Sequence, residues 1–418
     1  MFRTIRKNIL ASLMTLVCCQ LPAADFVRGA DLSWCTEMEA DGMRFYDRNG
    51  KETEIFQLMK QIGLNAIRLR VWVNPEQQYG PWSDKTDVLE KCRRAHAAGL
   101  DILIDFHYSD CFADPGKQTK PVAWQGHSFE QLKTDIANHT KDVLQAMKDE
   151  GIEAKWVQVG NETSSGMAYD DGRIMWNTSF LDASWTNYAT LSNAGYDAVK
   201  EIFPNAFVIV HHDNGSADNS SFYQTFKQHG GKFDMIGLSC YPDWSDWQNS
   251  NTLAAQQVQN LHNTFHVPVM VVETGFSTWD TTKGSGEEQT GDSKLAENVF
   301  KDLFGKMEKQ SGCKGILYWE PEVYGGWEHY IDENGVTIKN NGAYGKYVSC
   351  NGAFTKDGKA ALALLVFGNG TTDFDACSNN SADEHVRYYN MQGMQIDASF
   401  SGVIIMRKDG KAFKIIRR

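Results

Sequence analysis

Two glutamates carry the clearest chemical signal in the chain. Asn161-Glu162 follows the apolar run Trp156-Val-Gln-Val-Gly160, and Glu273 ends the run Val269-Met-Val-Val-Glu273. Because an isolated buried charge is costly, a carboxylate at the end of a buried strand must line a cavity or be paired. Two facing carboxyl groups can cut a glycosidic bond: one, protonated, donates to the leaving oxygen, and the other, ionised, attacks the anomeric carbon or activates water. Most Glu residues are only solvated surface charges, so the pair, rather than either residue, predicts catalysis.

A third apolar run carries two arginines that could partner these acids. Arg68, Arg70 and Trp72 alternate along the run 66–72, so their side chains share one face of a strand. An inward-pointing arginine needs an anion, and a strand-end glutamate such as Glu273 is the natural one. We therefore expect Arg68 or Arg70 to keep Glu273 ionised. The alternative for either arginine is a purely structural ion pair.

Histidines near two further strand ends offer hydrogen bonds or metal ligands. Asp105, His107 and Ser109 share a face at the end of the run 102–107, and His211-His212 ends another run. The His and carboxylate spacings are not diagnostic of a metal site. We therefore predict no metal here and expect Asp105, His107 and His211 to bind sugar or carboxylate groups.

Tryptophans and a third acid complete the candidate site. The chain has 12 Trp, and the flat face of an indole can stack on a sugar ring, although core packing accounts for most of them. We expect Trp124, Trp319 and Trp327 to line a groove. Glu320 stands between Trp319 and Pro321 and is a competing third acid, with a role in substrate binding or in structure.

The segments that must position these residues alternate between two patterns. Apolar, β-rich runs occur at 29–34, 66–72, 102–107, 156–160, 207–211, 235–239, 269–273 and 315–319. Helical periodicity occurs between them at 55–62, 89–98, 132–147, 188–202, 253–265 and 295–307, with a last helix expected at 359–367. Eight such alternations predict an α/β protein, a closed (β/α)₈ TIM barrel whose active site lies at the C-terminal ends of the strands. A doubly wound open sheet is the rival, but no G-x-G-x-x-G loop follows the first run.

The composition and the two ends of the chain limit its class. The chain has 418 residues, 42% of them hydrophobic, and a net charge of −12, which fits a globular protein and argues against nucleic-acid binding. Residues 1–24 are typical of a signal peptide, with Arg3, Arg6 and Lys7 before a short apolar run that is too short to span a membrane. We expect a secreted or cell-surface protein; a lipid anchor at Cys18 or Cys19 is the less favoured alternative.

The rest of the chain divides into three parts. Residues 25–370 are expected to form the barrel, and 371–385, rich in Asn, Asp and Ser, a linker. Residues 386–418 hold three strand-like runs, at 386–391, 402–407 and 413–416, and form a short β-rich C-terminal extension. Among the seven cysteines beyond the signal segment, Cys35 and Cys111 each follow a strand, and we hypothesise that they bridge; the alternative is two buried thiols.

Several of these motifs resemble one known family. They are Gly29-Ala-Asp-Leu-Ser33, Asn65-Ala-Ile-Arg-Leu-Arg-Val-Trp-Val-Asn-Pro75, Asp105-Phe-His-Tyr-Ser-Asp110, Ala113-Asp-Pro-Gly116, Val159-Gly-Asn-Glu162, Gly237-Leu-Ser239, Tyr241-Pro242, Val272-Glu-Thr274 and Tyr318-Trp-Glu-Pro321. Over about residues 26–367 the sequence resembles the glycoside hydrolase family 53 endo-β-1,4-galactanases. The resemblance implies a retaining enzyme acting on plant cell-wall galactan, with Glu162 as acid/base and Glu273 as nucleophile. It also implies that Asn161 contacts the sugar 2-hydroxyl, that Trp319 floors the cleavage subsite, and that Tyr241 binds substrate.

The same resemblance leaves some alternatives open. A related barrel enzyme for β-mannan or β-glucan is the rival within the class, and a galactan-binding protein that has lost catalysis is the rival outside it; intact Glu162 and Glu273 argue against the second. No cofactor is required and a monomer is expected. Some family members hold calcium, and Asp332-Glu333-Asn334-Gly335 is acidic enough to consider, but its spacing is not diagnostic. The C-terminal extension resembles β-rich tails that direct secretion.

Overall fold

The computed structural model describes residues 26–75, 81–243, 245–276, 293–324, 327, 330–331, 337–338 and 351–368, together with the backbone of four strands between 387 and 417. The expected signal peptide at 1–24, the linker at 371–385 and the acidic segment Asp332–Gly335 lie outside the described residues. The chain divides into two compact units, residues 1–370 and residues 371–418.

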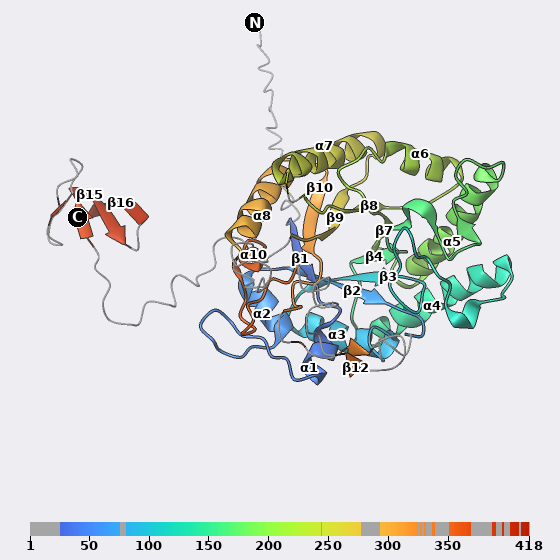
Figure 1. The fold of residues 1–418 in the computed structure, drawn as a ribbon, viewed down its shortest axis with the longest axis horizontal. Coiled ribbons are helices and arrows are strands. Elements are labelled where there is room, and N and C mark those ends of the chain that lie inside the picture. The colour runs from blue at the N-terminus through green and yellow to red at the C-terminus, as the bar shows by residue number, and fades with distance from the viewer. Residues whose placement is uncertain are drawn as a thin grey trace, which may run out of the picture. The chain divides into compact units, whose positions relative to one another are not determined.

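Eight parallel strands close into a barrel in the first unit. They are β1 (Val27–Asp31), β2 (Ala66–Val71), β3 (Asp101–Phe106), β4 (Trp156–Val159), β7 (Phe207–His212), β8 (Met235–Ser239), β9 (Val269–Thr274) and β10 (Cys313–Tyr318). Figure 1 shows β1 beside β10, and β1 pairs in parallel with both β10 and β2, which closes the ring. The predicted TIM barrel is therefore confirmed and the open doubly wound sheet is excluded, since an open sheet leaves its edge strands with one neighbour.

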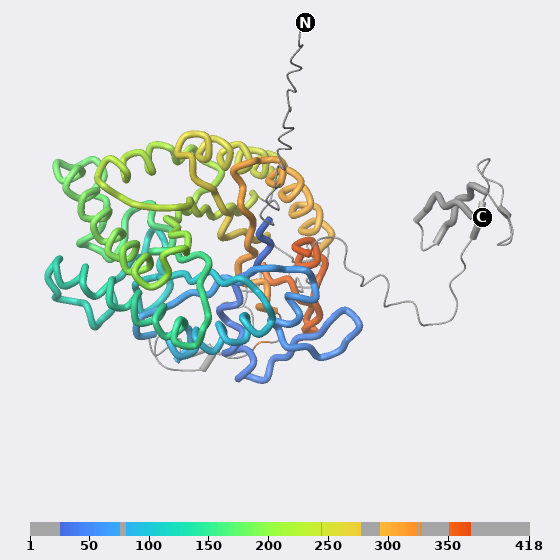
Figure 2. Tube along the Cα trace, turned by 180° about the vertical axis from the view of Figure 1, so that it is seen from behind, coloured from blue at the N-terminus to red at the C-terminus, as the bar shows by residue number. Residues whose placement is uncertain are grey.

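Helices surround the strands on the outside (Figure 2). They are α1 (Cys35–Ala40), α2 (Ile55–Ile62), α3 (Lys85–Ala97), α4 (Phe129–Asp149), α5 (Leu181–Ile202), α6 (Ser220–Gln228), α7 (Trp247–Phe265), α8 (Lys294–Met307) and α10 (Leu362–Leu365), with 3₁₀ turns at Val122–Trp124 and Thr163–Ser165. Short two-stranded pieces also occur: β5 (Gly166–Met167) pairs with β6 (Gly172–Arg173), and β11 (Tyr330–Ile331) with β12 (Thr337–Ile338).

Most of the predicted helices are present, but one is much shorter than expected and some helices were not predicted. The predicted helix at 55–62 has the bounds of α2, whereas α6 was not predicted. The helix expected at 359–367 is only the four-residue α10, because Lys359 and Ala360 instead form β-bridges to Tyr46 and Phe354. This bridge also brings residues near 359 beside the N-terminal part of the chain, as Figure 2 shows.

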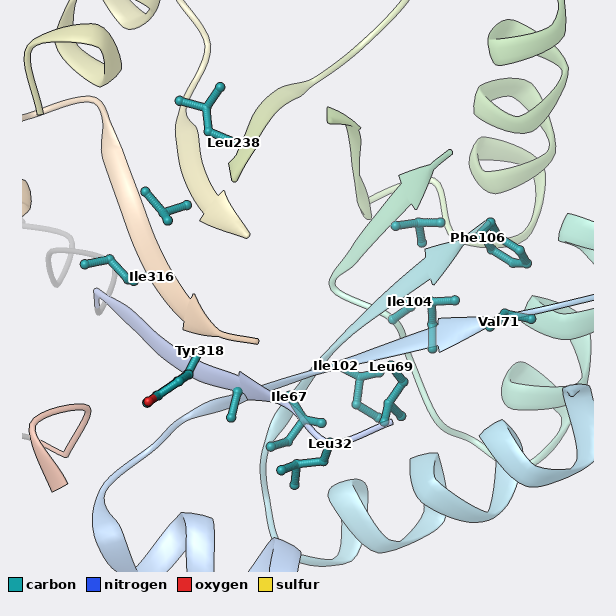
Figure 3. Packing of buried hydrophobic residues seen from close by; sticks show 14 of the residues in the cluster. Leu32, Ile67, Leu69, Val71, Ile102, Ile104, Phe106, Leu238, Ile316 and Tyr318 are labelled. Atoms are coloured by element: carbon teal, nitrogen blue, oxygen red, sulfur yellow. The ribbon is translucent and has the colours of Figure 1, made fainter. Parts of the chain in front are cut away.

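Alternation along the strands divides the core and aims the polar side chains. Ile67, Leu69 and Val71 of β2 lie beside Ile102, Ile104 and Phe106 of β3 (Figure 3) and belong to the large buried cluster that packs against the helices. The intervening residues of β2, Arg68 and Arg70, are equally buried and therefore point into the barrel. A second, smaller apolar cluster lies on this inner side; its members are Val27, Ala66, Leu103, Trp156, Ile209, Met235, Met270, Val272 and Leu317.

The second unit is a small antiparallel sheet. Its strands β13 (Arg387–Tyr389), β14 (Gln395–Ile396), β15 (Gly402–Lys408) and β16 (Lys411–Arg417) lie in the order β14-β13-β15-β16. Three of them overlap the predicted runs, and β14 was not predicted.

The hypothesis of a disulfide between Cys35 and Cys111 is wrong. Both are buried thiols with no bond between them. Cys35 begins α1 and packs into the large apolar cluster, whereas the Cys111 Sγ lies 3.7 Å from Ser109 Oγ, so the two side chains have separate surroundings. In the part of the chain that the structure describes, no helix is both long and apolar enough to cross a membrane.

Candidate active site

Glu162 and Glu273 meet at the C-terminal mouth of the barrel. Glu162 follows β4 with a left-handed backbone (φ 47°), and Glu273 lies near the end of β9. One carboxylate oxygen of each residue lies within 4.8 Å of the other. This separation agrees with the ~5–5.5 Å of retaining glycosidases and is shorter than the ~6.5–9.5 Å that leaves room for a water in inverting enzymes.

Arg68 is the cation that holds Glu273. Its Nη1 donates to Asp31 at 2.7 Å, and its Nη2 donates to Glu273 Oε1 and Asp105 Oδ2, each at 2.7 Å, and to Asn161 Oδ1 at 2.8 Å. Burial raises the pKa of Glu273 to about 6, and the charge of Arg68 opposes this rise. Glu273 is therefore ionised near neutral pH.

Glu162 faces a negative neighbour where Glu273 has a positive one. Burial, followed by the charge of Glu273, raises the pKa of Glu162 to about 8, and a hydrogen bond from Ser239 opposes the rise. Near neutral pH Glu162 thus keeps its proton while Glu273 is ionised. Two carboxyl groups with pKa values pushed apart by their surroundings form an acid and a nucleophile.

A buried serine and histidine stand beside the two acids. Ser239 Oγ lies 2.6 Å from Glu162 Oε1, where it can donate to the carboxylate when Glu162 is ionised, and His211 Nε2 lies 2.8 Å from the same Oγ. Burial lowers the pKa of His211 well below its ordinary value, so the ring is neutral. Glu162, His211 and Glu273 each offer one potential metal-ligand atom, and these atoms lie within 4.8 Å of one another. However, both ring nitrogens of His211 have hydrogen-bond partners, so proton chemistry explains the trio better than a metal ion does.

Asp105 and His107 brace Arg68 from β3. His107 Nδ1 accepts the backbone N–H of Ala113 at 2.9 Å, so the proton of a neutral ring lies on Nε2, which faces Asp105 Oδ2 at 3.0 Å. Burial favours the neutral acid, but Arg68 and His107 outweigh it and lower the pKa of Asp105. Asp105 therefore contributes a fixed negative charge beneath the catalytic pair.

Glu320 is the partner of Arg70 and does not replace Glu273. Glu320 Oε1 accepts from Arg70 Nη1 at 2.6 Å, and the carboxyl is fully buried. The Arg70 guanidinium carbon lies 4.2 Å from the Trp34 ring centroid, 4.8 Å from that of Trp72 and 4.6 Å from that of Phe112, an aromatic cage. Burial raises the pKa of Glu320 to about 8, and Arg70 opposes this. Of the two candidate arginines, Arg68 alone contacts Glu273 in the described structure.

A cavity of about 300 Å³ contains these groups. Its lining residues are Asp31, Arg68, Arg70, His107, Phe112, Ala113, Asp114, Asn161, Glu162, Glu273, Trp319 and Glu320. Tyr241 lies at the same place, because its hydroxyl donates to Glu273 Oε2 at 3.0 Å and its half-exposed ring is 6.3 Å from that of Trp319. Asp105 and His211 do not line the cavity themselves but contact residues that do, Asp105 through Arg68 and His211 through the backbone of Glu162. Ser239, Asp31 and Phe112 were not predicted as site residues.

Two of the predicted aromatic residues lie elsewhere. Trp124 is 6% exposed and packs on the rings of Tyr108 and His139 at 6.5 and 6.1 Å. Trp327 is 2% exposed; its ring lies 5.5 Å from that of Trp34, and its Nε1 donates to Asp41 at 2.8 Å. Neither lines the described cavity, because both rings are covered by packing, so among the described residues only Trp319 of the three lies at the catalytic pair.

Comparison with known proteins agrees with this geometry. The model of glycosyl hydrolase family 53 matches residues 27–367. The endo-β-1,4-galactanase of Bacillus subtilis is 33% identical over 71% of this chain and 70% of its own length. The arabinogalactan endo-β-1,4-galactanase of Cellvibrio japonicus is 31% identical over 76% of this chain and 87% of its own length.

Solved structures agree as well. The family 53 catalytic domain of Ignisphaera aggregans has a TM-score of 0.68 and 28% identity, covering 84% of this chain and 97% of that one. A fungal β-1,4-galactanase gives the same TM-score and identity, covering 82% and 98%. With a family match over most of the barrel, the chain belongs to glycosyl hydrolase family 53.

Proposed function

We propose that the chain is a retaining endo-β-1,4-galactanase that cleaves β-1,4-galactosidic bonds in the (arabino)galactan of plant cell walls. The observation that carries the mechanism is the approach of Glu162 and Glu273 to within 4.8 Å, with their pKa values raised to about 8 and about 6. The substrate rests on the galactanases among the relatives, whose sequences cover the same barrel.

The reaction runs in two displacements. In the first, Glu273 attacks the anomeric carbon while Glu162 gives its proton to the leaving glycosidic oxygen, which forms a glycosyl ester on Glu273 and a free chain end. In the second, ionised Glu162 takes a proton from water, the water oxygen attacks the anomeric carbon, and Glu273 leaves as a carboxylate. The proton balance of both carboxyl groups is thereby restored, so the mechanism needs no cofactor.

Neighbouring residues are assigned to binding and orientation. The amide of Asn161 uses one N–H on the Ala113 carbonyl at 2.8 Å, which leaves the other for a sugar hydroxyl such as the 2-hydroxyl. Trp319 lines the cavity and supplies an aromatic face for the sugar at the cleaved bond. Arg68 and Tyr241 hold Glu273, as their contacts at 2.7 and 3.0 Å support.

The N-terminal sequence pattern supports a proposal for where the protein is located. A basic segment, an apolar segment and Pro22-Ala23-Ala24 support export with cleavage before Asp25, and we propose a secreted or cell-surface monomer. Sequencing the N-terminus of the exported protein and measuring its mass in solution test this. A lipid-modified Cys18 or Cys19 would contradict soluble export, and a stable dimer would contradict the monomer.

A panel of polysaccharides tests the function. Purified enzyme is incubated with galactan, arabinogalactan, β-mannan and β-glucan, and the products are sized, with Glu273→Gln as a matched inactive control. Galactan is expected to yield fragments of many lengths early and short oligosaccharides late, since an endo-acting enzyme cuts internal bonds. Cleavage of mannan or glucan in preference to galactan would overturn the substrate, and galactan binding without any cleavage would overturn the enzyme.

A further inference from the structure

Ser239 lies between the two catalytic carboxyl groups. Its Oγ is 2.6 Å from Glu162 Oε1 and 3.5 Å from Glu273 Oε2. The residue is the last of β8 and only 1% exposed, so bulk water does not compete for its hydroxyl. A single O–H at this position is within reach of either carboxylate.

The surroundings of His211 fix the direction of this hydroxyl. His211 Nδ1 faces Gln158 Nε2 at 2.8 Å and accepts the Glu162 backbone N–H at 3.2 Å. It also lies 3.1 Å from Asn161 Oδ1, but that oxygen already accepts from Arg68 and Gln158, which favours Nδ1 as an acceptor. Because Nδ1 is an acceptor, the proton of the neutral ring lies on Nε2 and is donated to Ser239 Oγ at 2.8 Å. One lone pair of the serine oxygen is thereby occupied, and its own proton is left for a carboxylate.

We propose that Ser239 is a positioning residue whose hydroxyl follows the negative charge between Glu273 and Glu162 during the reaction. The inference rests on the proposed two-displacement function. In the free enzyme Glu162 is neutral and donates its own O–H to Ser239 Oγ across the 2.6 Å contact, so the serine proton turns toward the ionised Glu273, the stronger acceptor. In the glycosyl-enzyme Glu273 is an ester and Glu162 is ionised, so the hydroxyl turns toward Glu162. Ser239 keeps its proton throughout.

Other charged groups face the pair but do not substitute for this hydroxyl. Arg68 from β2 and Tyr241 after β8 contact Glu273. The remaining charges that influence the pair are Asp31 after β1, Asp105 from β3 and Asp213 after β7. None of these contacts is to the Glu162 carboxyl, where Ser239 supplies the hydrogen bond within the described structure.

A fixed donor and a switching donor predict different pH profiles for Ser239→Ala. If the hydroxyl always donated to Glu162, its loss would raise only the pKa of the second ionisation, that of Glu162. The upper limb of the kcat/KM profile would then move to higher pH. If the hydroxyl switches, Ser239→Ala removes one charge-assisted hydrogen bond from the Glu162–Glu273 pair when one carboxyl group is ionised, and also one when both are ionised. The pKa of the first ionisation, that of Glu273, then rises by roughly one unit, and the pKa of the second ionisation hardly changes.

The experiment measures kcat/KM on galactan from pH 4 to 10 for the wild type, Ser239→Ala and Ser192→Ala. Ser192 is a fully buried serine on α5 and controls for the loss of a buried hydroxyl. We expect the lower limb of the Ser239→Ala profile to move to higher pH by roughly one unit, while its upper limb stays in place. Both limbs of the Ser192→Ala profile should also stay in place. Movement of the upper limb alone, or of neither limb, would overturn the switch.

A second measurement works without turnover. Carboxyl ¹³C NMR titrations, assigned with Glu162→Gln and Glu273→Gln, give both pKa values in the free enzyme directly. Ser239→Cys, with a weaker donor of similar size, should shift the lower pKa in the same direction by less, and it replaces the alanine variant if that fails to fold. If wild-type enzyme leaves galactan intact, the proposed function fails on its own; if it cleaves galactan and the lower pKa does not move, only this inference fails.

Discussion

A carboxylate oxygen of Glu162 and one of Glu273 lie within 4.8 Å of each other, although their strands, β4 and β9, are separated in the barrel by β7 and β8. The closed ring brings the ends of non-neighbouring strands to a common mouth. Two acids so close cannot ionise with equal ease, and Arg68, which contacts Glu273 but not the Glu162 carboxyl, decides which of the two carries the charge. The acid and the nucleophile are thus set by one asymmetric ion pair.

The first prediction concerns pH. Activity requires ionised Glu273 and protonated Glu162, whose pKa values are raised to about 6 and about 8. The rate should therefore rise with pH through about 6 and fall through about 8, giving a bell-shaped profile of kcat/KM. Both raised values also mean that these acids favour the folded state below their unfolded pKa and lose that contribution as pH rises. An optimum below pH 5 would contradict the assignment.

The second prediction concerns the acid/base. Glu162→Ala should lose most activity on galactan, since nothing protonates the leaving oxygen. It should still form the glycosyl-enzyme from a dinitrophenyl β-galactobioside, whose leaving group needs no proton, and then stall. Added azide should restore turnover and yield a β-glycosyl azide, measured by NMR. If azide changes nothing, Glu162 is not the acid/base.

The third prediction concerns Arg68. Arg68→Met leaves Asp31, Asp105 and Glu273 buried without their shared cation, which should cost about 3–5 kcal/mol of unfolding free energy. The loss should be smaller at acidic pH, because the stranded carboxyl groups can then take up protons. Urea unfolding measures it. The surface control Arg93→Met, whose partners Glu90 and Glu150 are exposed, should change the unfolding free energy far less than Arg68→Met does. Equal losses would contradict the role of Arg68.

The fourth prediction separates a binding tryptophan from a packing one. Trp319 lines the cavity, whereas Trp124 is packed on Tyr108 and His139. Trp319→Ala should lower kcat/KM roughly tenfold or more with little change in stability, because a stacking face is lost. Trp124→Ala should lower the unfolding free energy by about 3–5 kcal/mol and leave the kcat/KM of the folded fraction near the wild-type value. The reverse pattern would place substrate at Trp124.

Features that depend on residue period and strand position could be predicted from the sequence. Alternation along β2 placed Arg68 and Arg70 on one face that points into the barrel, and all eight strands were located. The same period could not show which of Arg68 and Arg70 contacts Glu273. Both share one face of the strand, and only their positions along the barrel axis decide this. Ser239 stood in the motif Gly237-Leu-Ser239, but nothing in its apolar strand marked its side chain as a site residue.

Other features depended on tertiary packing. Whether a tryptophan is exposed to substrate or covered by a neighbouring ring is a matter of packing, so the sequence could not show that Trp124 and Trp327 pack against other rings. The disulfide between Cys35 and Cys111 failed for a similar reason: a position just after a strand does not determine which way a side chain turns.

The central claim is that Glu273 is the nucleophile, and trapping the intermediate tests it most directly. The wild-type enzyme is incubated with a 2-deoxy-2-fluoro β-galactobiosyl fluoride, digested, and mapped by mass spectrometry. The fluorine slows both steps, and the good leaving group lets the first proceed, so a covalent adduct should accumulate. We predict one adduct per chain, located on the peptide that contains Glu273 and absent from Glu273→Gln. An adduct on Glu320 or Glu162, or inversion of the anomeric centre with no adduct, would contradict the account.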